Sequence, residues 1–498
     1  MDNIKLSYYE FLDGLSDEDR ELLRVFFREF DLNFSLSKAE KRAFRQDFEE
    51  AITVLCERGA SVREACERLS LTNLGGFYAR PSIAWFPLDD AAKIYPICLE
   101  HGLQNNFRIS VYFKEEVVPE ILQMALTFTI KRFPGFSTSL KKGFFWHYLD
   151  AVKKRFPVEE ERDAPCQPIK VSISGSSSFR IMYYRNRMSA EFFHILTDGT
   201  GASVFVKALA GEYLRLLGIN SADEDGDLID IHETPTKEEL ENAFVKVEKA
   251  ATGSGFVDKS SLQMSGKLSS ARPCRVLHFK MNKDKLHEAA KRHGVTVTVY
   301  LLAKMFLATS AACDELTGDI NIQLPVNMRK FYQTKTLRNF AMFTGIKIPI
   351  DKISDTDELF SEIVRQMEEK TSKEKMHEMI TAAVNIVSSI RYIPLVIKAP
   401  VAKLVYGFIG ENIYTTTLSN LGIVKMPKEY SEHIESMDFC LGAPLLNRLA
   451  CAVVTFGDIT TFSVTKMTPD PTFEEKMYKY LSDDGIEIKV EGSEYYAH

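Results

Sequence analysis

The chain has 498 residues, of which 45% are hydrophobic and 26% charged, and its formal net charge is −7. This length predicts two or three domains with ample apolar core. The acidic balance argues against a nucleic-acid backbone as the main partner, because binding to such a partner calls for a basic face.

Eight cysteines are scattered singly, form no CxxC pair and lie near no histidine at zinc-finger spacing. We therefore expect no structural metal and a reducing, cytoplasmic location. The first residues are acidic and lack an apolar core, so we expect no signal peptide.

Residues 1–75 predict an amphipathic helical extension. Apolar side chains recur there at helical spacing: Leu22, Leu23, Phe26, Phe27 and Phe30. Ser61 and Glu64 form a capping-box pattern at the start of a further helix. A turn-rich stretch at 71–82 ends the extension.

Residues 76–255 predict a first α/β lobe. The stretch "FRISVYF" has the β-branched and aromatic content of a strand, and Pro119 fits the first turn of the helix that follows it. Paired strands around a Gly/Ser turn are expected within 170–186. They lead to "HILTDG", which stands directly ahead of another amphipathic helix.

The stretch 251–273 is rich in Gly and Ser, from which we expect a linker at 256–273 and a second lobe at 274–498. Asn282 can cap a helix that ends at Gly294. The stretches "GDINIQLPVNMR" and "NFAMFTGIKIPI" predict core strands, and "CAVVTFGDITTFSVTK" predicts a hairpin. Each half thus shows a strand, a helix and further strands, which indicates two similar lobes.

One apolar stretch, residues 386–410, carries Arg391, Lys398 and Lys403 as well as two prolines. A membrane-spanning helix needs about 20 apolar residues without such charges. The favoured interpretation is a core helix interrupted by prolines. The alternative is an interfacial patch, and thus a peripheral membrane contact, through which an apolar substrate reaches the active site.

In "HILTDG", His194 and Asp198 stand four residues apart, and Gly199 follows. Histidine titrates near neutral pH, as a general base must, and needs a fixed group to hold one tautomer. The apolar flanks indicate a buried loop, in which Asp198 would need a cation as partner. By itself the hexapeptide is more typical of a helix start beside a satisfied core histidine.

Several segments, in this order, resemble the chloramphenicol-acetyltransferase-like, CoA-dependent acyltransferases, which include alcohol acetyltransferases and the condensation domains of peptide synthetases. They are "WFPLDDAAKIYP", the strand and helix that end at Phe133-Pro134, the HxxxDG signature itself, "LPVNMRKFYQTKTLRNFA" and "TTTLSNLG". Together they cover about residues 85–470. Phe193 stands where condensation domains usually carry a second histidine, and the Asp-Phe-Gly-Trp motif of plant members is absent.

This resemblance implies an α/β fold of two chloramphenicol-acetyltransferase-like lobes, with mixed sheets flanked by helices and an active-site tunnel between them. It implies that His194 is the catalytic base, that Asp198 organises the loop and that Gly199 keeps the tunnel open. Arg329 is the candidate ion-pair partner of Asp198, and the alternative is a surface arginine at a strand end. Ser419 and Asn420 could line the tunnel or help to hold the oxyanion, although a strand-end turn is the favoured interpretation.

The expected activity is therefore acyl transfer from acyl-CoA to the hydroxyl of a small hydrophobic alcohol. Acyl-CoA would be a co-substrate, and neither a metal nor a resident cofactor is expected. Two alternatives stay open: a condensation enzyme fed by a carrier protein, and a non-catalytic binding protein on the same fold. The acyl chain length, the acceptor and the oligomeric state are left open by the sequence.

Overall fold

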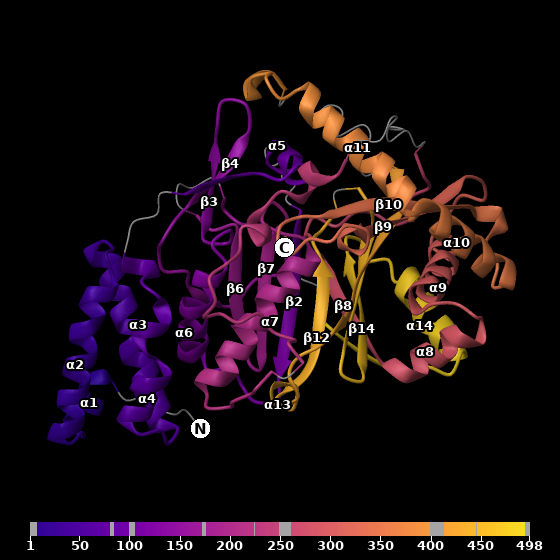
Figure 1. Ribbon diagram of the computed structural model, residues 1–498. Helices are drawn as coiled ribbons and strands as arrows, with labels where there is room; N and C mark the ends of the chain where they lie inside the picture. Colours follow the sequence, from indigo (N-terminus) through magenta and orange to yellow (C-terminus); the bar gives the residue numbers. More distant parts are fainter. Residues whose placement is uncertain are drawn as a thin grey trace.

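The computed structural model describes residues 7–79, 84–98, 105–171, 176–223, 225–248, 260–398, 413–444 and 446–493. Mixed sheets form two lobes that lie side by side, with helices packed on their outer faces (Figure 1). The predicted α/β class with two lobes and an N-terminal helical extension is confirmed.

The extension consists of four helices at one side of the first lobe (Figure 1): α1 (Tyr8–Asp13), α2 (Asp17–Asn33), α3 (Lys38–Glu57) and α4 (Val62–Arg68). Ser61 caps α4 in the predicted capping box with Glu64. The apolar faces of these helices join the core of the first lobe, where the Phe48 ring meets the Phe128 ring edge-on at 6.1 Å. A buried ion pair between Asp47 and Arg155, 2.7 Å apart, adds a polar contact between them.

The first lobe is built on a five-stranded sheet in the order β12-β2-β7-β6-β5. Its strands are β2 (Asn106–Phe113), β5 (Val158–Glu160), β6 (Phe179–Tyr184), β7 (Arg187–Phe193) and β12 (Ile434–Leu441). The helices α6 (Pro119–Thr129) and α7 (Gly199–Leu216) pack against each other beside this sheet. Pro119 occupies the first turn of α6, as predicted.

The paired strands expected around the Gly/Ser stretch are in part wrong. The observed hairpin is β6–β7, and its turn lies at Arg185 and Asn186. Arg185 takes a positive φ of 50°, and the Asn186 side chain donates to the carbonyl of Phe113. The turn thus places a non-glycine residue in the left-handed region, and the Asn186 bond to the neighbouring strand helps to hold it there. Residues 172–175 lie outside the described residues.

The second lobe is built on a seven-stranded sheet in the order β10-β9-β11-β13-β14-β8-β15. Its strands are β8 (Arg275–Asn282), β9 (Asp319–Asn327), β10 (Ala341–Pro349), β11 (Thr416–Val424), β13 (Leu449–Phe456), β14 (Ile459–Lys466) and β15 (Ile488–Gly492). Its helices are α8 (Lys283–Arg292), α9 (Val297–Ala311), α10 (Asp357–Lys370), α11 (Lys373–Ser389) and α14 (Thr472–Asp483). Asn282 caps α8, and β13 and β14 form the predicted hairpin.

The strand β12 lies in the second half of the sequence but pairs with β2, in the sheet of the first lobe. The predicted linker at 256–273 therefore does not separate the strands of one sheet from those of the other, because β12 follows the linker in the sequence but belongs to the first sheet. The described part of the predicted linker, residues 260–273, is irregular and bonds to the second lobe, for example from the Leu262 N–H to the Asp319 carbonyl.

A small three-stranded sheet contains β1 (Trp85–Pro87), β3 (Thr138–Lys142) and β4 (His147–Ala151) in the order β1-β4-β3. Two further short helices are α5 (Tyr95–Cys98) and α13 (Lys428–Ser431). In the described residues no single helix is long and apolar enough to span a bilayer; α8 and α9 together meet the length and composition, but they are bent by 78°.

The core interpretation of the stretch 386–410 is wrong for its described part. The buried face of α11 ends at Ala382, and beyond the helix Val396 and Ile397 are exposed while Leu395 is buried. Leu395 packs into the protein, whereas the next two apolar side chains, Val396 and Ile397, face solvent. Residues 399–410, with Lys403, lie outside the described residues.

Candidate active site between the lobes

The HxxxDG loop connects the central strand of the first lobe to a helix. β7 ends at Phe193 opposite Asn106 of β2, and the His194 N–H donates to the Asn105 carbonyl at 2.9 Å. After a turn at 194–197, α7 begins at Gly199. The strand thus fixes the backbone of His194, and its half-buried imidazole lies against the aromatic rings of Tyr95 and Phe107.

The His194 imidazole is held by a residue of the second lobe. Its Nδ1 lies 2.7 Å from Oδ1 of Asn339. The amide nitrogen of Asn339 donates to the His194 carbonyl at 2.8 Å and to Asp89 Oδ2 at 3.1 Å. The His194 carbonyl and the Asp89 carboxylate can only accept, so the amide NH₂ of Asn339 must point toward them. Its Oδ1 then faces the imidazole and accepts from Nδ1–H. In the neutral imidazole this contact selects the tautomer that carries its proton on Nδ1.

Asp89 orients this amide from a fully buried position. Its Oδ1 accepts from the Ala92 N–H at 2.7 Å, and the Arg338 guanidinium lies 3.8 Å from Oδ2. Burial raises the pKa of Asp89, whereas Arg338 and Asn339 act in the opposite direction. Asp89 thus acts on His194 only through Asn339.

Asp198 is held by three donors. It caps α7, where its Oδ1 accepts from the Gly201 N–H at 3.1 Å. Its Oδ2 accepts from Arg329 Nη1 and from the Phe340 N–H, both at 2.8 Å. The structure therefore brings the two proposed ion-pair partners together, with Arg329 Nη1 and Asp198 Oδ2 2.8 Å apart.

Arg329 links several parts of the second-lobe loop. Its remaining N–H groups donate to the carbonyls of Thr336 and Arg338 and to the side chain of Asn327. Asn327 in turn donates to Thr200 in the first turn of α7. The guanidinium thus fixes the loop that presents Asn339 to His194.

The two glycines at the start of α7 meet different surroundings. A Cβ on Gly199 would come within 3.2 Å of the Leu421 side chain, which belongs to β11. A Cβ on Gly201 would lie only 2.2 Å from the Leu337 carbonyl oxygen and 2.3 Å from Thr197 Oγ1. Gly201, which the motif does not include, therefore permits a close approach between the start of α7 and the Leu337 backbone.

Ser419 and Asn420 lie on β11, next to Leu421 and so near the start of α7. The Asn420 amide donates to Thr298, and its Oδ1 accepts from the Gly422 N–H across the bulge of the strand. These bonds lie at a bulge within β11, whose pairing with β13 resumes at Ile423 and continues to Val424. A role in lining a tunnel stays a prediction.

Two pockets border the segment that carries Asn339. An apolar cavity with room for about 20 Å³ lies between Leu196, Leu337 and the small sheet, which is space for about one water. An open pocket of about 260 Å³ is lined by Phe331, Tyr332 and Phe340 among others. The second pocket is large enough for a small organic group.

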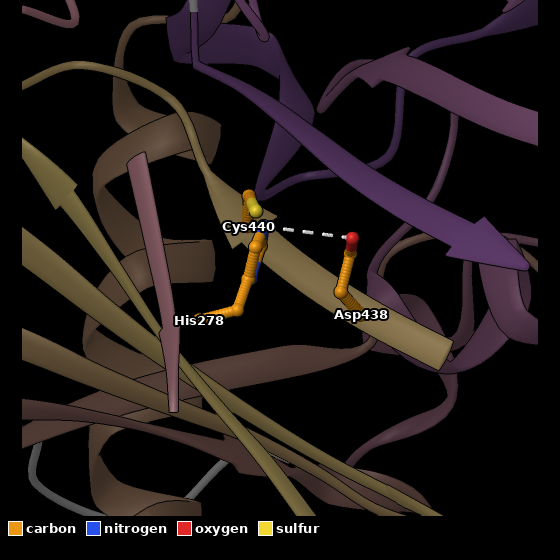
Figure 2. A group of neighbouring side chains, drawn as sticks. All are labelled: His278, Asp438 and Cys440. Atoms are coloured by element: carbon orange, nitrogen blue, oxygen red, sulfur yellow. Dashed lines mark ion pairs between the residues drawn. The ribbon is translucent and has the colours of Figure 1, made fainter. Parts of the chain in front are cut away.

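A separate buried group joins the lobes where β8 faces β12: His278, Asp438 and Cys440 (Figure 2). Their donor atoms all lie within 4.8 Å of one another, which is compatible with metal binding. Burial raises the pKa of the Cys440 thiol well above its usual range, which keeps the thiol neutral and a poor ligand. The residues are already bonded to their neighbours: His278 to Ser463 at 2.9 Å and Asp438 to Tyr112 at 2.7 Å.

Burial lowers the pKa of the His278 imidazole, and the nearby cations Arg187, Lys280 and Arg108 lower it further. A divalent ion bound there would meet their repulsion. We therefore interpret the group as a polar contact between the lobes. The expectation that the chain binds no metal stays a prediction.

Two of the residues that hold the loop, Asn339 and Asp89, were not among the sequence candidates. Both lie in segments that carried the family resemblance, "LRNFA" and "WFPLDDAAKIYP". No spacing in the sequence connects positions 89, 194 and 339, because the contact depends on how the two lobes meet.

No protein-family model and no curated protein matches the chain. Solved structures do match. Polyketide synthase associated protein 5 from Mycobacterium tuberculosis is 12% identical with a TM-score of 0.53, over 80% of this chain and 97% of that one. TRI101 of F. sporotrichioides, complexed with coenzyme A and T-2, is 11% identical with a TM-score of 0.54, over 81% and 99%.

The starter condensation domain of rhizomide synthetase RzmA, in complex with C8-CoA, is 12% identical with a TM-score of 0.52, over 80% of this chain and 94% of that one. At these identities the likeness shows the fold. The chain therefore shares the two-lobed fold of these acyltransferase-related and condensation-domain structures.

Proposed function

We propose that the protein transfers an acyl group from acyl-CoA to the hydroxyl of a small hydrophobic alcohol, with His194 as general base. The hydrogen bond between His194 Nδ1 and Asn339 Oδ1 carries this proposal. A histidine that only fills a core needs no fixed tautomer, whereas a base must present one unprotonated nitrogen to its substrate. The surrounding network supplies that condition.

In the proposed reaction, Nε2 of His194 takes the proton from the acceptor hydroxyl as its oxygen attacks the thioester carbonyl. The tetrahedral intermediate then breaks its C–S bond, and the imidazolium returns the proton to the leaving thiolate. The products are an ester and free CoA. The Asn339 oxygen stabilises the imidazolium, because it accepts from Nδ1–H throughout.

Asp198 has a structural part in this reaction. Its contacts with Arg329 and the Phe340 N–H tie the loop of the first lobe to the second lobe. The same segment that receives Asp198 also presents Asn339. Loss of this tie would misplace the base, and a shift of about 1 Å is enough to cost about 100-fold in rate.

The structural neighbours support the donor and acceptor classes. One neighbour is named as a trichothecene 15-O-acetyltransferase, TRI101 is complexed with coenzyme A and T-2, and the RzmA domain is in complex with C8-CoA. By analogy we assign an acyl-CoA donor and an alcohol acceptor to this protein. Phe193, which replaces the second histidine of condensation domains, favours a free-standing acyltransferase.

The test is a screen of acyl-CoA thioesters of increasing chain length against a panel of alcohols, with thiol release and ester mass as the two readouts. Amines and a carrier-protein-bound acyl group serve as the contrasting acceptor and donor. We expect ester formation from acyl-CoA that depends on the alcohol. Amide formation from the carrier-bound group alone would assign the protein to the condensation enzymes, and no turnover of any thioester would contradict the proposal.

A further inference from the structure

Two segments far apart in the sequence meet at one end of the molecule and expose apolar side chains together. One is the tip of the β3–β4 hairpin and the other follows α11; Figure 1 shows both on the same upper side. The Leu395 N–H donates to the Phe144 carbonyl at 2.9 Å, and the Phe145 and Tyr392 rings lie 6.2 Å apart. These contacts join the two segments into one surface.

We define the apolar tip by six exposed residues: Phe144, Phe145, Tyr392, Ile393, Val396 and Ile397. Phe144 is 71% exposed and Val396 74% exposed. Single exposed apolar residues are ordinary, but a contiguous group of this kind marks an interaction surface.

The two segments that form the apolar tip carry basic residues and no acidic ones. The segment 139–147 contains Lys141 and Lys142, and the segment 383–398 contains Arg391 and Lys398. Neither segment contains Asp or Glu, although the chain as a whole is acidic. Lys142 and Arg391 are exposed. Lys398 lies over the Trp146 ring at 3.3 Å and so connects the two segments from beneath.

We propose that the apolar tip is a membrane-docking surface that inserts its aromatic and aliphatic side chains at an anionic lipid interface. Apolar insertion flanked by Lys and Arg is the pattern by which proteins lie on anionic bilayers. Each basic side chain near such a surface raises binding by about fivefold at low salt. A local excess of positive charge on an acidic protein orients the tip toward the lipid.

A second copy of the chain fits the same surface less well. A symmetric dimer presents the same patch from both subunits. Lys142 and Arg391 of one copy would then face the same basic residues of the other, with no carboxylate in either segment to pair with them. Charge complementarity therefore favours anionic lipid.

The inference stands apart from acyl transfer, since docking is measured without substrate. The hairpin that carries Phe144 also contributes Leu149 to the small cavity beside the HxxxDG loop. A docked protein would thus hold the small sheet near the lipid. The proposal concerns binding alone, so it can fail while the proposed activity holds.

The test is co-sedimentation of the full chain with vesicles of phosphatidylcholine alone or mixed with phosphatidylserine, at low and high salt. We expect binding to the anionic vesicles at low salt and its loss at about 1 M salt, where charges are screened within about 3 Å. The double variant Val396→Glu/Ile397→Glu should bind at least about tenfold more weakly. Because both side chains are exposed, the variant should fold as the parent does.

The matched control is Leu32→Glu/Leu316→Glu, which adds the same charge at two residues that are 80% and 83% exposed elsewhere. It should bind anionic vesicles as the parent protein does. Equal losses in both double variants, or no binding of the parent protein to anionic vesicles at low salt, would overturn the proposal. A dimer in sedimentation velocity that only the tip variant disrupts, without vesicle binding, would assign the surface to a second copy instead.

Discussion

Asn339 and the residue after it, Phe340, hold His194 and Asp198 of the HxxxDG loop in the opposite lobe. The Asn339 side chain lies 2.7 Å from His194 Nδ1, and the Phe340 N–H donates to Asp198 at 2.8 Å. One dipeptide of the second lobe thus positions both the proposed base and the carboxylate that anchors its loop. Correct apposition of the lobes is therefore a condition for a competent base.

Asn339→Leu should lower turnover by about 100-fold while it leaves substrate affinity nearly unchanged. Leucine has a similar volume but cannot accept from Nδ1–H, so the imidazole loses its fixed tautomer and orientation. Steady-state kinetics with separate kcat and KM will check this. A rise in KM with unchanged kcat would show that Asn339 serves substrate binding instead.

The exchanged pair Asp89→Asn/Asn339→Asp should recover part of that turnover and move the acidic limb of the pH–rate profile to higher pH. The new carboxylate can still accept from Nδ1–H, and its negative charge raises the pKa of His194. A profile that stays in place in this variant would mean that position 339 does not act on the base.

Asp198→Ala and Arg329→Ala should each lower the free energy of unfolding by about 3–5 kcal/mol, because each strands the other charge in a buried position. The double variant should be no less stable than the poorer single variant. Chemical denaturation of the three variants gives the comparison. Simply additive losses would show that the two residues contribute independently.

Gly201→Ala should destabilise the protein by about 1–3 kcal/mol, because its methyl group would collide with the Leu337 carbonyl and with Thr197. Gly199→Ala meets only the flexible Leu421 side chain and should cost less than about 1 kcal/mol. Melting temperatures of both variants test this order. The reverse order would mean that the lobes meet differently at the start of α7.

Stability should fall as the pH decreases below about 6.5. Burial lowers the pKa of His278, with Arg187, Lys280 and Arg108 acting in the same direction and Asp438 opposing them. Below its ordinary pKa the unfolded chain binds a proton that the folded protein rejects, so the slope is at most about 1.4 kcal/mol per pH unit. In His278→Gln this part of the pH dependence should disappear, as measured by denaturation between pH 5 and pH 8.

Local patterns in the sequence predicted elements and caps, because these depend on nearby residues. The capping box at Ser61, the cap at Asn282 and the turn between β13 and β14 all lie where the pattern places them. Contacts between residues that lie far apart in the sequence leave no local pattern of this kind. The pairing of β12 with β2 and the role of Asn339 depend on the packing of whole lobes.

The sequence predicted three of the residues that the structure brings together, His194, Asp198 and Arg329, but not Asn339 or Asp89. His194 and Asp198 share a short motif, and Arg329 followed from the family resemblance combined with the cost of an unpaired buried charge. Asp89 carried no distinguishing feature, since it is one of two adjacent aspartates, and the other, Asp90, pairs with Lys93. Only the structure shows which of the two faces the amide of Asn339.

The rate of alcohol-dependent thiol release by His194→Ala, measured beside its melting temperature, tests the central claim most directly. If His194 is the base, turnover should fall by about 10²- to 10⁴-fold, while the melting temperature stays close to that of the parent protein. Thioester consumption at a near-normal rate by a folded His194→Ala variant would contradict the mechanism.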